Sequence, residues 1–492
     1  MLAALNDNNT ATMPWVIELK KFITNLRRAV RKESFRIRPP HVFATEKKPG
    51  SGKYRAISLF KLRDRVAMAL CAKYLTALFD AGLFESACAF RNNGSAGPCR
   101  DSAVEDIIRF RKENAGELFV AEADIRGFYD TIDHSIVKKA FSSALGKARK
   151  HGTPASSTAT RIFNASLRSY TFRGAQVQCS RRFKDMGVAA KLSFPREAMK
   201  AVHGNLHKSR LGIPQGGALS GLIANLVLDH ADKAVTDAIG TEICLYKRYC
   251  DDMIIISPDR SVAEKAFNAY RRAVEKLGLS MHPPKDVVKY SRDFYDEKSK
   301  SVYRWADPEK HHGAVPRIQF LGYLLRHDAV LSIRDSTITK ELAKQEKTGA
   351  RIIEAARRSP KLSTGQIMAA ANGRLVAMAV GKSSHIDDNS ISAMCWASGF
   401  NLLGKHRHCC SGKLKLLDRG RTNQLARIRR EVSWREGTGR RSSPGSGAPP
   451  AYLGSPYSYH GQFAKKNTDP TTRKAATMLR KLKAWCGNTC DK

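Results

Sequence analysis

The 492-residue sequence predicts an α+β fold, and three observations lead to it. Helical patterns alternate with short apolar, strand-like runs between about residues 41 and 325. Tight turns join some neighbouring runs, which favours antiparallel hairpins over the long crossovers of a parallel sheet. From residue 331 the chain becomes helical and basic, with 30 Lys and Arg against 11 Asp and Glu. We expect an antiparallel sheet flanked by helices, followed by a helical region.

The first hundred residues predict a helix, a hairpin and a second helix. The basic stretch VIELKKFITNLRRAVRKESFRIR indicates a helix that ends before Pro39 and Pro40. Two strand-like pieces in ATEKKPGSGKYRAISLF flank the turn-rich tip 48–52, as in a β-hairpin. The apolar spacing of KLRDRVAMALCAKYLTALFDAGL then predicts an amphipathic helix.

The middle of the chain predicts a strand that ends at Asp124 and a helix from about Thr131 through Ala144. Residues 146–210 are basic and interrupted by Ser and Gly, and they favour no single element. Further along, the sequence predicts a helix from about Leu219, a hairpin around Asp251 and Asp252, a helix over 263–277 and an extended segment over 317–327.

The charge of the chain indicates a polyanionic partner. The sequence has 85 Lys and Arg against 45 Asp and Glu, a formal net charge of +40. Solubilising surface charge explains a small excess better than one of this size, so nucleic acid is the favoured partner. The sequence contains no run of about eighteen apolar residues, and the N-terminus has no secretion-signal pattern. Together with eleven scattered cysteines, these features favour a cytoplasmic protein without a membrane span.

Three carboxylates are the strongest chemical signal in the sequence. Asp251 and Asp252 lie between apolar strands in ICLYKRYCDDMIIIS, and Asp124 ends the strand in LFVAEADIRGFYD. Neighbouring carboxylates are costly in a half-buried setting unless a cation neutralises them. Hard divalent ions prefer oxygen ligands, and a pair of them can serve phosphoryl transfer. The alternative for the Asp pair by itself is a cap on a hairpin turn.

Six segments, in order, resemble the successive motifs of reverse transcriptases: GKYRAISLFKLRDRV, ADIRGFYDTIDH, GIPQGGALSGLIAN, YCDD, GLSMHPPK and FLGY. The similarity covers roughly residues 45–325 and is closest to the bacterial group II intron, retron and defence-associated enzymes. It implies a right-hand polymerase fold in which the antiparallel sheet is the palm. The implied domains are an N-terminal helix and fingers over 1–105, a palm over 106–330 with a fingers insertion at about 146–210, a helical thumb over 331–435, and a flexible linker with a basic tail over 436–492.

The resemblance implies that Asp124, Asp251 and Asp252 are the catalytic residues. With the carbonyl of Ile125 as an extra ligand, they would hold two Mg²⁺ ions, for which Mn²⁺ is a substitute. Tyr129 matches the aromatic ring that excludes a 2′-hydroxyl and so favours dNTPs.

Other matched residues are expected at the nucleotide or the primer. The nucleotide-binding candidates are Lys53, Arg55, Phe128, Tyr129, Gln215, Gly216 and Lys285, and core packing is the favoured role of the Phe128 ring. The family's primer grip matches Phe320, Leu321, Gly322 and Tyr323. Gly221 departs from the motif, which usually has proline there.

Two local patterns have simpler interpretations. The sequence around DTIDH is tempting as an Asp-His pair, but Thr131 and Asp133 suit caps of the following helix better. His406, His408, Cys409 and Cys410 match no paired zinc-binding spacing, so a zinc site is the less favoured interpretation.

By elimination, the motifs favour the defence-associated group. The sequence after the predicted thumb contains no H-x-x-x-H or paired-cysteine nuclease pattern, and the thumb region lacks the retron Val-Thr-Gly signature. Such enzymes copy a partner non-coding RNA, so the expected partners are a structured RNA template, a DNA product and dNTPs in the bacterial cytoplasm. Two alternatives stay open: weakly templated or protein-primed DNA synthesis, with tyrosines of 452–459 as primers, and an RNA-binding maturase or scaffold. A homo-oligomer also stays open.

Overall fold

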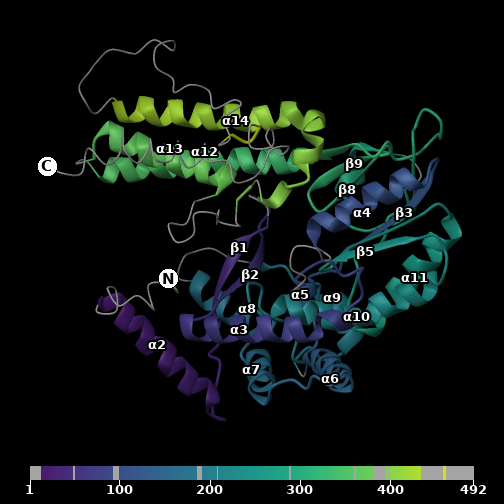
Figure 1. Cartoon of the computed structure of the whole chain (residues 1–492), viewed down its shortest axis with the longest axis horizontal. Helices are drawn as coiled ribbons and strands as arrows, with labels where there is room; N and C mark the ends of the chain where they lie inside the picture. Colours follow the sequence, from purple (N-terminus) through teal and green to yellow (C-terminus); the bar gives the residue numbers. More distant parts are fainter. Residues whose placement is uncertain are drawn as a thin grey trace. The chain divides into compact units, whose positions relative to one another are not determined.

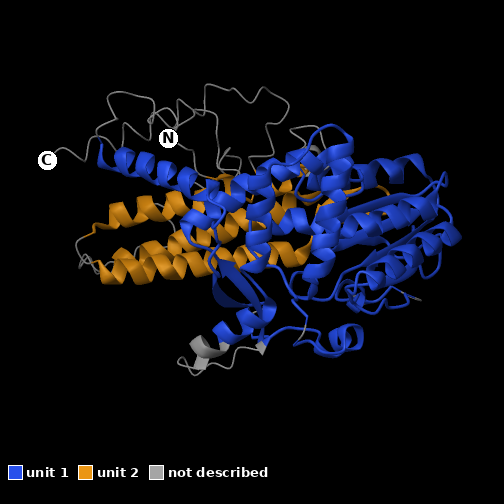
Figure 2. Cartoon of the chain, turned by 90° about the horizontal axis from the view of Figure 1, so that it is seen from below, with its two compact units in different colours: residues 1–321 blue, residues 322–492 orange. Residues whose placement is uncertain are grey.

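The computed structural model describes residues 13–47, 50–91, 99–184, 191–207, 209–287, 290–359, 362–381, 395–396, 398–433 and 458–460. The chain divides into two compact units, residues 1–321 and 322–492, which have different colours in Figure 2. The boundary predicted between residues 330 and 331 therefore falls inside the second unit. Most of the predicted tail 436–492 lies outside the described residues.

A four-stranded antiparallel sheet lies at the centre of the first unit, as predicted (Figure 1). Its order is β5 (Leu245–Tyr249), β6 (Asp252–Ser257), β3 (Leu118–Ala123) and β7 (Lys300–Trp305). The apolar run 253–256 makes β6 a fully buried strand after its exposed first residue. In the β3–β6 register, Ala123 pairs with Met253, so β3 ends beside the turn that joins β5 to β6.

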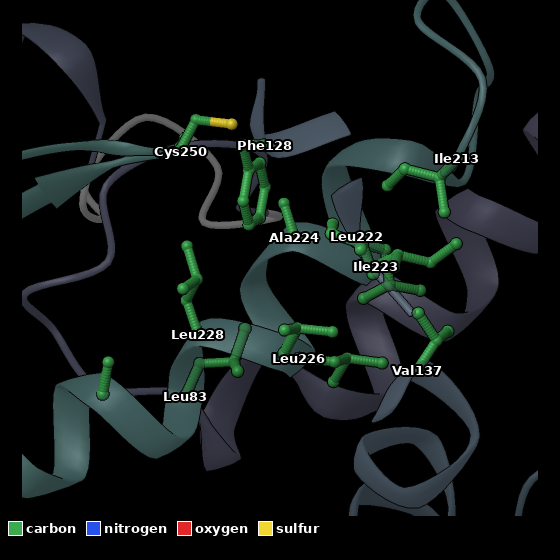
Figure 3. Packing of buried hydrophobic residues seen from close by; sticks show 14 of the residues in the cluster. Leu83, Phe128, Val137, Ile213, Leu222, Ile223, Ala224, Leu226, Leu228 and Cys250 are labelled. Carbon is green, nitrogen blue, oxygen red and sulfur yellow. The ribbon is translucent and has the colours of Figure 1, made fainter. Parts of the chain in front are cut away.

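Two long helices build the core beneath this sheet. Helix α11 (Arg260–Lys276) packs against β3, β6 and β7, and α10 (Ser220–Ile239) packs against α11. The side chain of Asp259 caps α11 by accepting a hydrogen bond from Ser261 N at 2.7 Å. The prediction of a helix from about Leu219 is confirmed, since Leu219 is the N-cap of α10. Figure 3 shows the apolar side chains of α10 packing in the cluster that also contains Phe128 and Cys250.

The predicted hairpin is confirmed, and the predicted N-terminal helix is present but ends earlier than expected. Helix α2 spans Pro14–Arg31, so residues 32–38, which were predicted to be helical, lie outside it. The antiparallel strands β1 (His41–Glu46) and β2 (Lys53–Leu59) precede α3 (Leu62–Phe79). The short strand β4 (Lys191–Leu192) pairs in parallel with β2 and completes a second sheet. Helix α4 (Arg100–Glu113) then leads into β3 and contacts β5.

The stretch that the sequence left unassigned is largely helical. It contains the end of α6 (His134–Lys150), then α7 (Ser157–Arg168), α8 (Phe172–Lys184) and α9 (Arg196–His203). The predicted start of α6 at Thr131 was early, because Asp133 caps the helix through a hydrogen bond from Ser135 N at 2.6 Å. Thr131 is not part of that cap, since its hydroxyl donates to the carbonyl of Gly127.

The described residues of the second unit form a strand pair and three long helices. Strands β9 (Tyr323–Arg326) and β10 (Leu331–Ile333) are antiparallel, and β8 (Arg317–Phe320) belongs to the first unit. Helices α12 (Asp335–Arg358), α13 (Thr364–Val380) and α14 (Leu403–Ser433) pack around one apolar cluster. The helical character predicted for this region is confirmed. None of the described helices has the length and apolarity needed to cross a bilayer.

Candidate active site

The turn between β5 and β6 presents the acidic pair. Tyr249 pairs with Asp252, so Cys250 and Asp251 form a two-residue turn. Cys250 has a left-handed φ of +61°, a conformation that non-glycine residues rarely adopt. Asp251 is half-buried at this turn and Asp252 is exposed at the start of β6. The aspartates therefore lie at one end of the central sheet.

Asp124 lies at the same end of the sheet. It directly follows β3, and the β3–β6 register brings it beside the turn. Burial is the main cause that raises the pKa of Asp251 above its usual value, and the negative charge of Asp124 is the second cause. The ammonium group of Lys298 forms an ion pair with Asp124. The two aspartates, far apart in sequence, are thus electrostatic neighbours, and a cation already pairs with one of them.

The donor chemistry of these aspartates fits a hard divalent cation. Carboxylate oxygens are the ligands that Mg²⁺ prefers, and the repulsion between Asp124 and Asp251 is what a bound cation would relieve. As the side chains lie, no group of three or more His, Cys, Asp or Glu in the described parts of the chain is arranged to hold a metal ion. Asp124 is instead engaged by Lys298, and Asp252 is turned to solvent. Ile125, whose carbonyl was expected as a ligand, is a buried residue next to Asp124.

A later segment holds the main chain of Asp124 in place. His282 N donates to the carbonyl of Asp124 at 3.0 Å, and Arg126 N donates to Ser280 at 2.7 Å. Lys285, in the same segment, is exposed, and its ammonium donates to Glu297 at 2.5 Å. Lys298, which no motif in the sequence indicated, therefore contacts Asp124, whereas Lys285 contacts Glu297.

Tyr129 and Phe128 have different surroundings. The hydroxyl of Tyr129 lies 3.0 Å from Cys250 Sγ, so its half-buried ring adjoins the acidic turn. Burial is the main cause that raises the pKa of the Cys250 thiol to about 12. Phe128 is only 1% exposed and packs in the core, edge-on to Tyr129 (Figure 3). Its ring therefore supports Tyr129 from within the core.

Gln215 is fixed both by its main chain and by its side chain. Its carbonyl accepts from Ser58 N at 2.8 Å, and its amide Nε2 donates to both carboxylate oxygens of Asp130 at 3.2 Å. Gly216 has a φ of +95°, and a Cβ there would lie 3.1 Å from the carbonyl of Ser58. A side chain at this position would therefore crowd β2, and the role of Gly216 at the nucleotide stays a prediction.

Asp130 was not predicted as part of the site. It is 3% exposed, and burial raises its pKa to about 7, while the hydrogen bond from Gln215 and the nearby Lys47 and Arg55 oppose the shift. Only the tertiary structure brings these cations to Asp130, because they come from the hairpin β1–β2.

The hairpin β1–β2 contributes cationic side chains near Asp130 and Asp124. Lys53 and Arg55 are exposed on β2, as expected of residues that contact a triphosphate. The pKa of Lys47 is lowered, first by burial and then by Arg55, while Asp130 and Asp124 oppose the shift. Lys47 was missed because it looked like one of several charges before the turn; Lys48 lies outside the described residues.

The departure from the motif at Gly221 has a steric explanation. A Cβ at Gly221 would lie 2.4 Å from Cγ of the Phe90 ring. A larger residue there would displace Phe90, whose own φ is +53°. The helix α10 nevertheless begins at Ser220.

The predicted primer-grip residues form a tight bend. Phe320 ends β8, Tyr323 begins β9, and Leu321 and Gly322 between them have φ values of +49° and +89°. The guanidinium of Arg100 donates twice to the carbonyl of Leu321, at 3.1 and 2.8 Å. Arg100 therefore anchors the start of the bend to α4.

Comparison with known proteins identifies the family. The family described as "Reverse transcriptase (RNA-dependent DNA polymerase)" matches residues 46–325. The chain belongs to the reverse transcriptase family. This span contains the acidic turn, Asp124, Tyr129 and Gln215.

Solved structures show distant similarity, and no curated protein matches the chain. Telomerase from Candida albicans, in complex with a fragment of telomeric RNA, is 11% identical, with a TM-score of 0.40. The comparison covers 83% of this chain and 58% of that chain. Apo telomerase from Candida tropicalis is 12% identical with a TM-score of 0.39, covering 81% and 60% of the two chains. The reverse transcriptase chain thus spans less than two thirds of the length of these structures.

Proposed function

We propose that this reverse transcriptase is an RNA-directed DNA polymerase that adds dNTPs to a primer 3′ end with the help of two Mg²⁺ ions. The observation that carries the proposal is the meeting of Asp124 with the Asp251–Asp252 turn inside the matched family span. A protein that only bound RNA would gain nothing from keeping these like charges together. The net charge of +40 supports a nucleic-acid partner.

In this proposal, Asp124, Asp251 and Asp252 hold the divalent ions, with the carbonyl of Ile125 as a further ligand. Bound there, Mg²⁺ or its substitute Mn²⁺ lowers the pKa of the primer 3′-hydroxyl and neutralises charge on the leaving pyrophosphate. Lys298 has to release the Asp124 carboxylate when the site is loaded, and its exposed side chain is free to swing away.

The nucleotide would lie between the hairpin β1–β2 and the acidic turn. Lys53 and Arg55 supply positive charge for the triphosphate, and Arg55 can engage a phosphate with two parallel donors. The ring of Tyr129 excludes a 2′-hydroxyl, and Gln215 and Gly216 lie at the nascent base pair. Lys285 would assist the pyrophosphate, and the bend Phe320–Tyr323 would hold the primer end.

The test is dNTP incorporation by the full chain with its co-purified RNA. The double variant Asp251→Asn/Asp252→Asn should lose incorporation at least about 1,000-fold while still binding RNA. Asp259→Asn is the matched control, because an asparagine also caps α11 and Asp259 lies outside the site. Equal incorporation by the double variant and the control would refute the site.

We further propose that the enzyme copies a partner non-coding RNA in the bacterial cytoplasm as part of antiphage defence. The support is the bacterial type of the motifs and the basic C-terminal third, which suits phosphate contacts with a structured RNA. Sequencing the RNA and DNA that co-purify, and plating phage on cells with the active or double-variant enzyme, would test this. A random set of RNAs, or equal plating on both strains, would refute it.

One of the tyrosines considered as a protein primer, Tyr459, is a poor candidate. Tyr459 is fully buried, and its hydroxyl donates to Glu341 at 2.7 Å, so that hydroxyl is not available to a nucleotide. Tyr452 and Tyr457 lie outside the described residues. DNA that stays covalently bound to protein after denaturation would favour this mode over an RNA or DNA primer.

A further inference from the structure

A fully buried ion pair lies beneath the acidic turn. Arg248 of β5 and Asp232 of α10 both have side chains that are 0% exposed. Arg248 Nε and Nη2 donate to the two carboxylate oxygens of Asp232 at 2.7 and 2.5 Å. Tyr246 also donates its hydroxyl to Asp232, at 2.7 Å. One carboxylate, one guanidinium and one tyrosine hydroxyl therefore form a buried polar cluster in the core.

Stability alone does not explain this cluster. Well-packed apolar residues in place of a buried ion pair are often neutral or stabilising, because desolvating the charges offsets their attraction. A buried ion pair is better explained if it holds another part of the structure in place, as buried polar side chains fix the register of the helices in coiled coils.

The remaining nitrogen of Arg248, Nη1, indicates what is positioned. It donates to the main-chain carbonyl of Cys250 at 3.0 Å and, at 3.4 Å, to Oδ1 of Asn225. Cys250 is the residue with a φ of +61°, and its carbonyl belongs to the peptide unit that leads into Asp251. A non-glycine residue persists in this region only where its surroundings hold it there. Arg248 supplies such a hold on the buried side of the turn.

We propose that Arg248, held by Asp232, is a positioning residue that fixes the left-handed turn at Cys250 and thereby the place of Asp251. The inference deepens the proposed function, on which its kinetic part rests. The contact itself can be tested without polymerase activity. Cys250 is a buried residue, 7% exposed, and a turn that loses its anchor should make its thiol more accessible.

The first experiment measures alkylation of Cys250 by N-ethylmaleimide in the full chain, followed by mass spectrometry of the peptide that contains it. The triple variant Arg248→Met/Asp232→Leu/Tyr246→Phe removes the carboxylate, the guanidinium and the tyrosine hydroxyl together, while Asn225 keeps its hydrogen bond to the carbonyl of Ala89. We expect it to fold, as judged by its thermal midpoint, and Cys250 to react at least about 10-fold faster.

A matched control exists in the same sheet. Lys300 and Tyr303 of β7 donate to Glu122 of β3, which gives another carboxylate, cation and tyrosine set. The variant Glu122→Leu/Lys300→Met/Tyr303→Phe should leave Cys250 reactivity at the wild-type level. Equal reactivity of Cys250 in the Arg248 variant and in wild type would overturn the proposal, whether or not the chain proves to be a polymerase.

The second experiment measures dNTP incorporation and changes the residue at the turn, Cys250. In the Arg248 triple variant, kcat for dNTP incorporation should fall about 10-fold or more with a smaller change in KM. Adding Cys250→Gly should recover about 5-fold of that loss, because glycine adopts a left-handed φ without steric cost. A loss that Cys250→Gly does not reduce would overturn the role at the turn. No incorporation by wild type would instead refute the proposed function and leave the alkylation result to decide.

Discussion

Asp130→Asn removes the buried carboxyl group that holds the amide of Gln215, and its effect on stability should depend on pH. Burial raises the pKa of Asp130 from 3.8 to about 7. An acid whose pKa is higher in the folded state stabilises the fold fully below its unfolded pKa. That contribution is then lost as the pH rises through the folded value. Wild type should therefore lose stability between about pH 4 and pH 7 through this group, and the Asn variant should not.

The size of the effect follows from the two pKa values. Between pH 5 and pH 8, the linkage relation gives a loss of about 2.5 kcal/mol for this one group. For a unit the size of residues 1–321, that free energy corresponds to roughly 4 °C in thermal midpoint. The midpoint of Asp130→Asn minus that of wild type should therefore rise by about 4 °C from pH 5 to pH 8.

The assay is thermal unfolding of both proteins across this pH range in one buffer series. Altered packing, or a changed hydrogen bond to the amide of Gln215, should produce a midpoint difference that does not depend on pH. Only the change of the midpoint difference with pH is therefore diagnostic. Midpoint curves that run parallel to within about 1 °C would refute the raised pKa and its cause, the burial of Asp130.

Two further predictions concern the ring beside the turn and the start of α10. Tyr129→Ala should raise the kcat/KM for NTPs relative to dNTPs by about 10-fold or more, and an unchanged ratio would remove the sugar-selecting role. Gly221→Ala should destabilise the fold by about 1–3 kcal/mol, because its Cβ would overlap the Phe90 ring. Thermal midpoints provide the check: adding Phe90→Ala should recover part of that loss, and a purely additive loss would contradict the overlap.

The local elements were predictable because their signals are local. Apolar spacing and turn residues indicated the hairpin of β1 and β2, the strand before Asp124 and the long helix α10. The segment 146–210 gave no such signal. Its helices are short and rich in small residues, and part of their burial comes from contacts such as the stacking of Phe163 on Phe141.

The candidate site was predictable only where a residue lies in a motif. Asp124, Asp251 and Tyr129 were found in this way, and the structure places them at one end of the sheet. Lys298 was missed because it lies 174 residues from Asp124 in sequence and follows no pattern of its own. Lys47 was missed because it looks like an ordinary charge before a turn. Asp130 lies inside the segment ADIRGFYDTIDH, but it was missed because nothing in the sequence indicates that its carboxyl group is buried.

By itself, the sequence determined the order of helices and strands outside 146–210, the family motifs and the residues that can bind a divalent cation. Periodicity, turn chemistry and residue type are properties of short segments. Only the tertiary structure decided which charges face one another. The antiparallel register of β3 and β6 brings Asp124 to the acidic turn, and the packing of α10 under β5 brings Asp232 to Arg248. Burial at these meeting points then sets the electrostatics of Asp130 and Asp251, because desolvation depends on neighbours from distant parts of the chain.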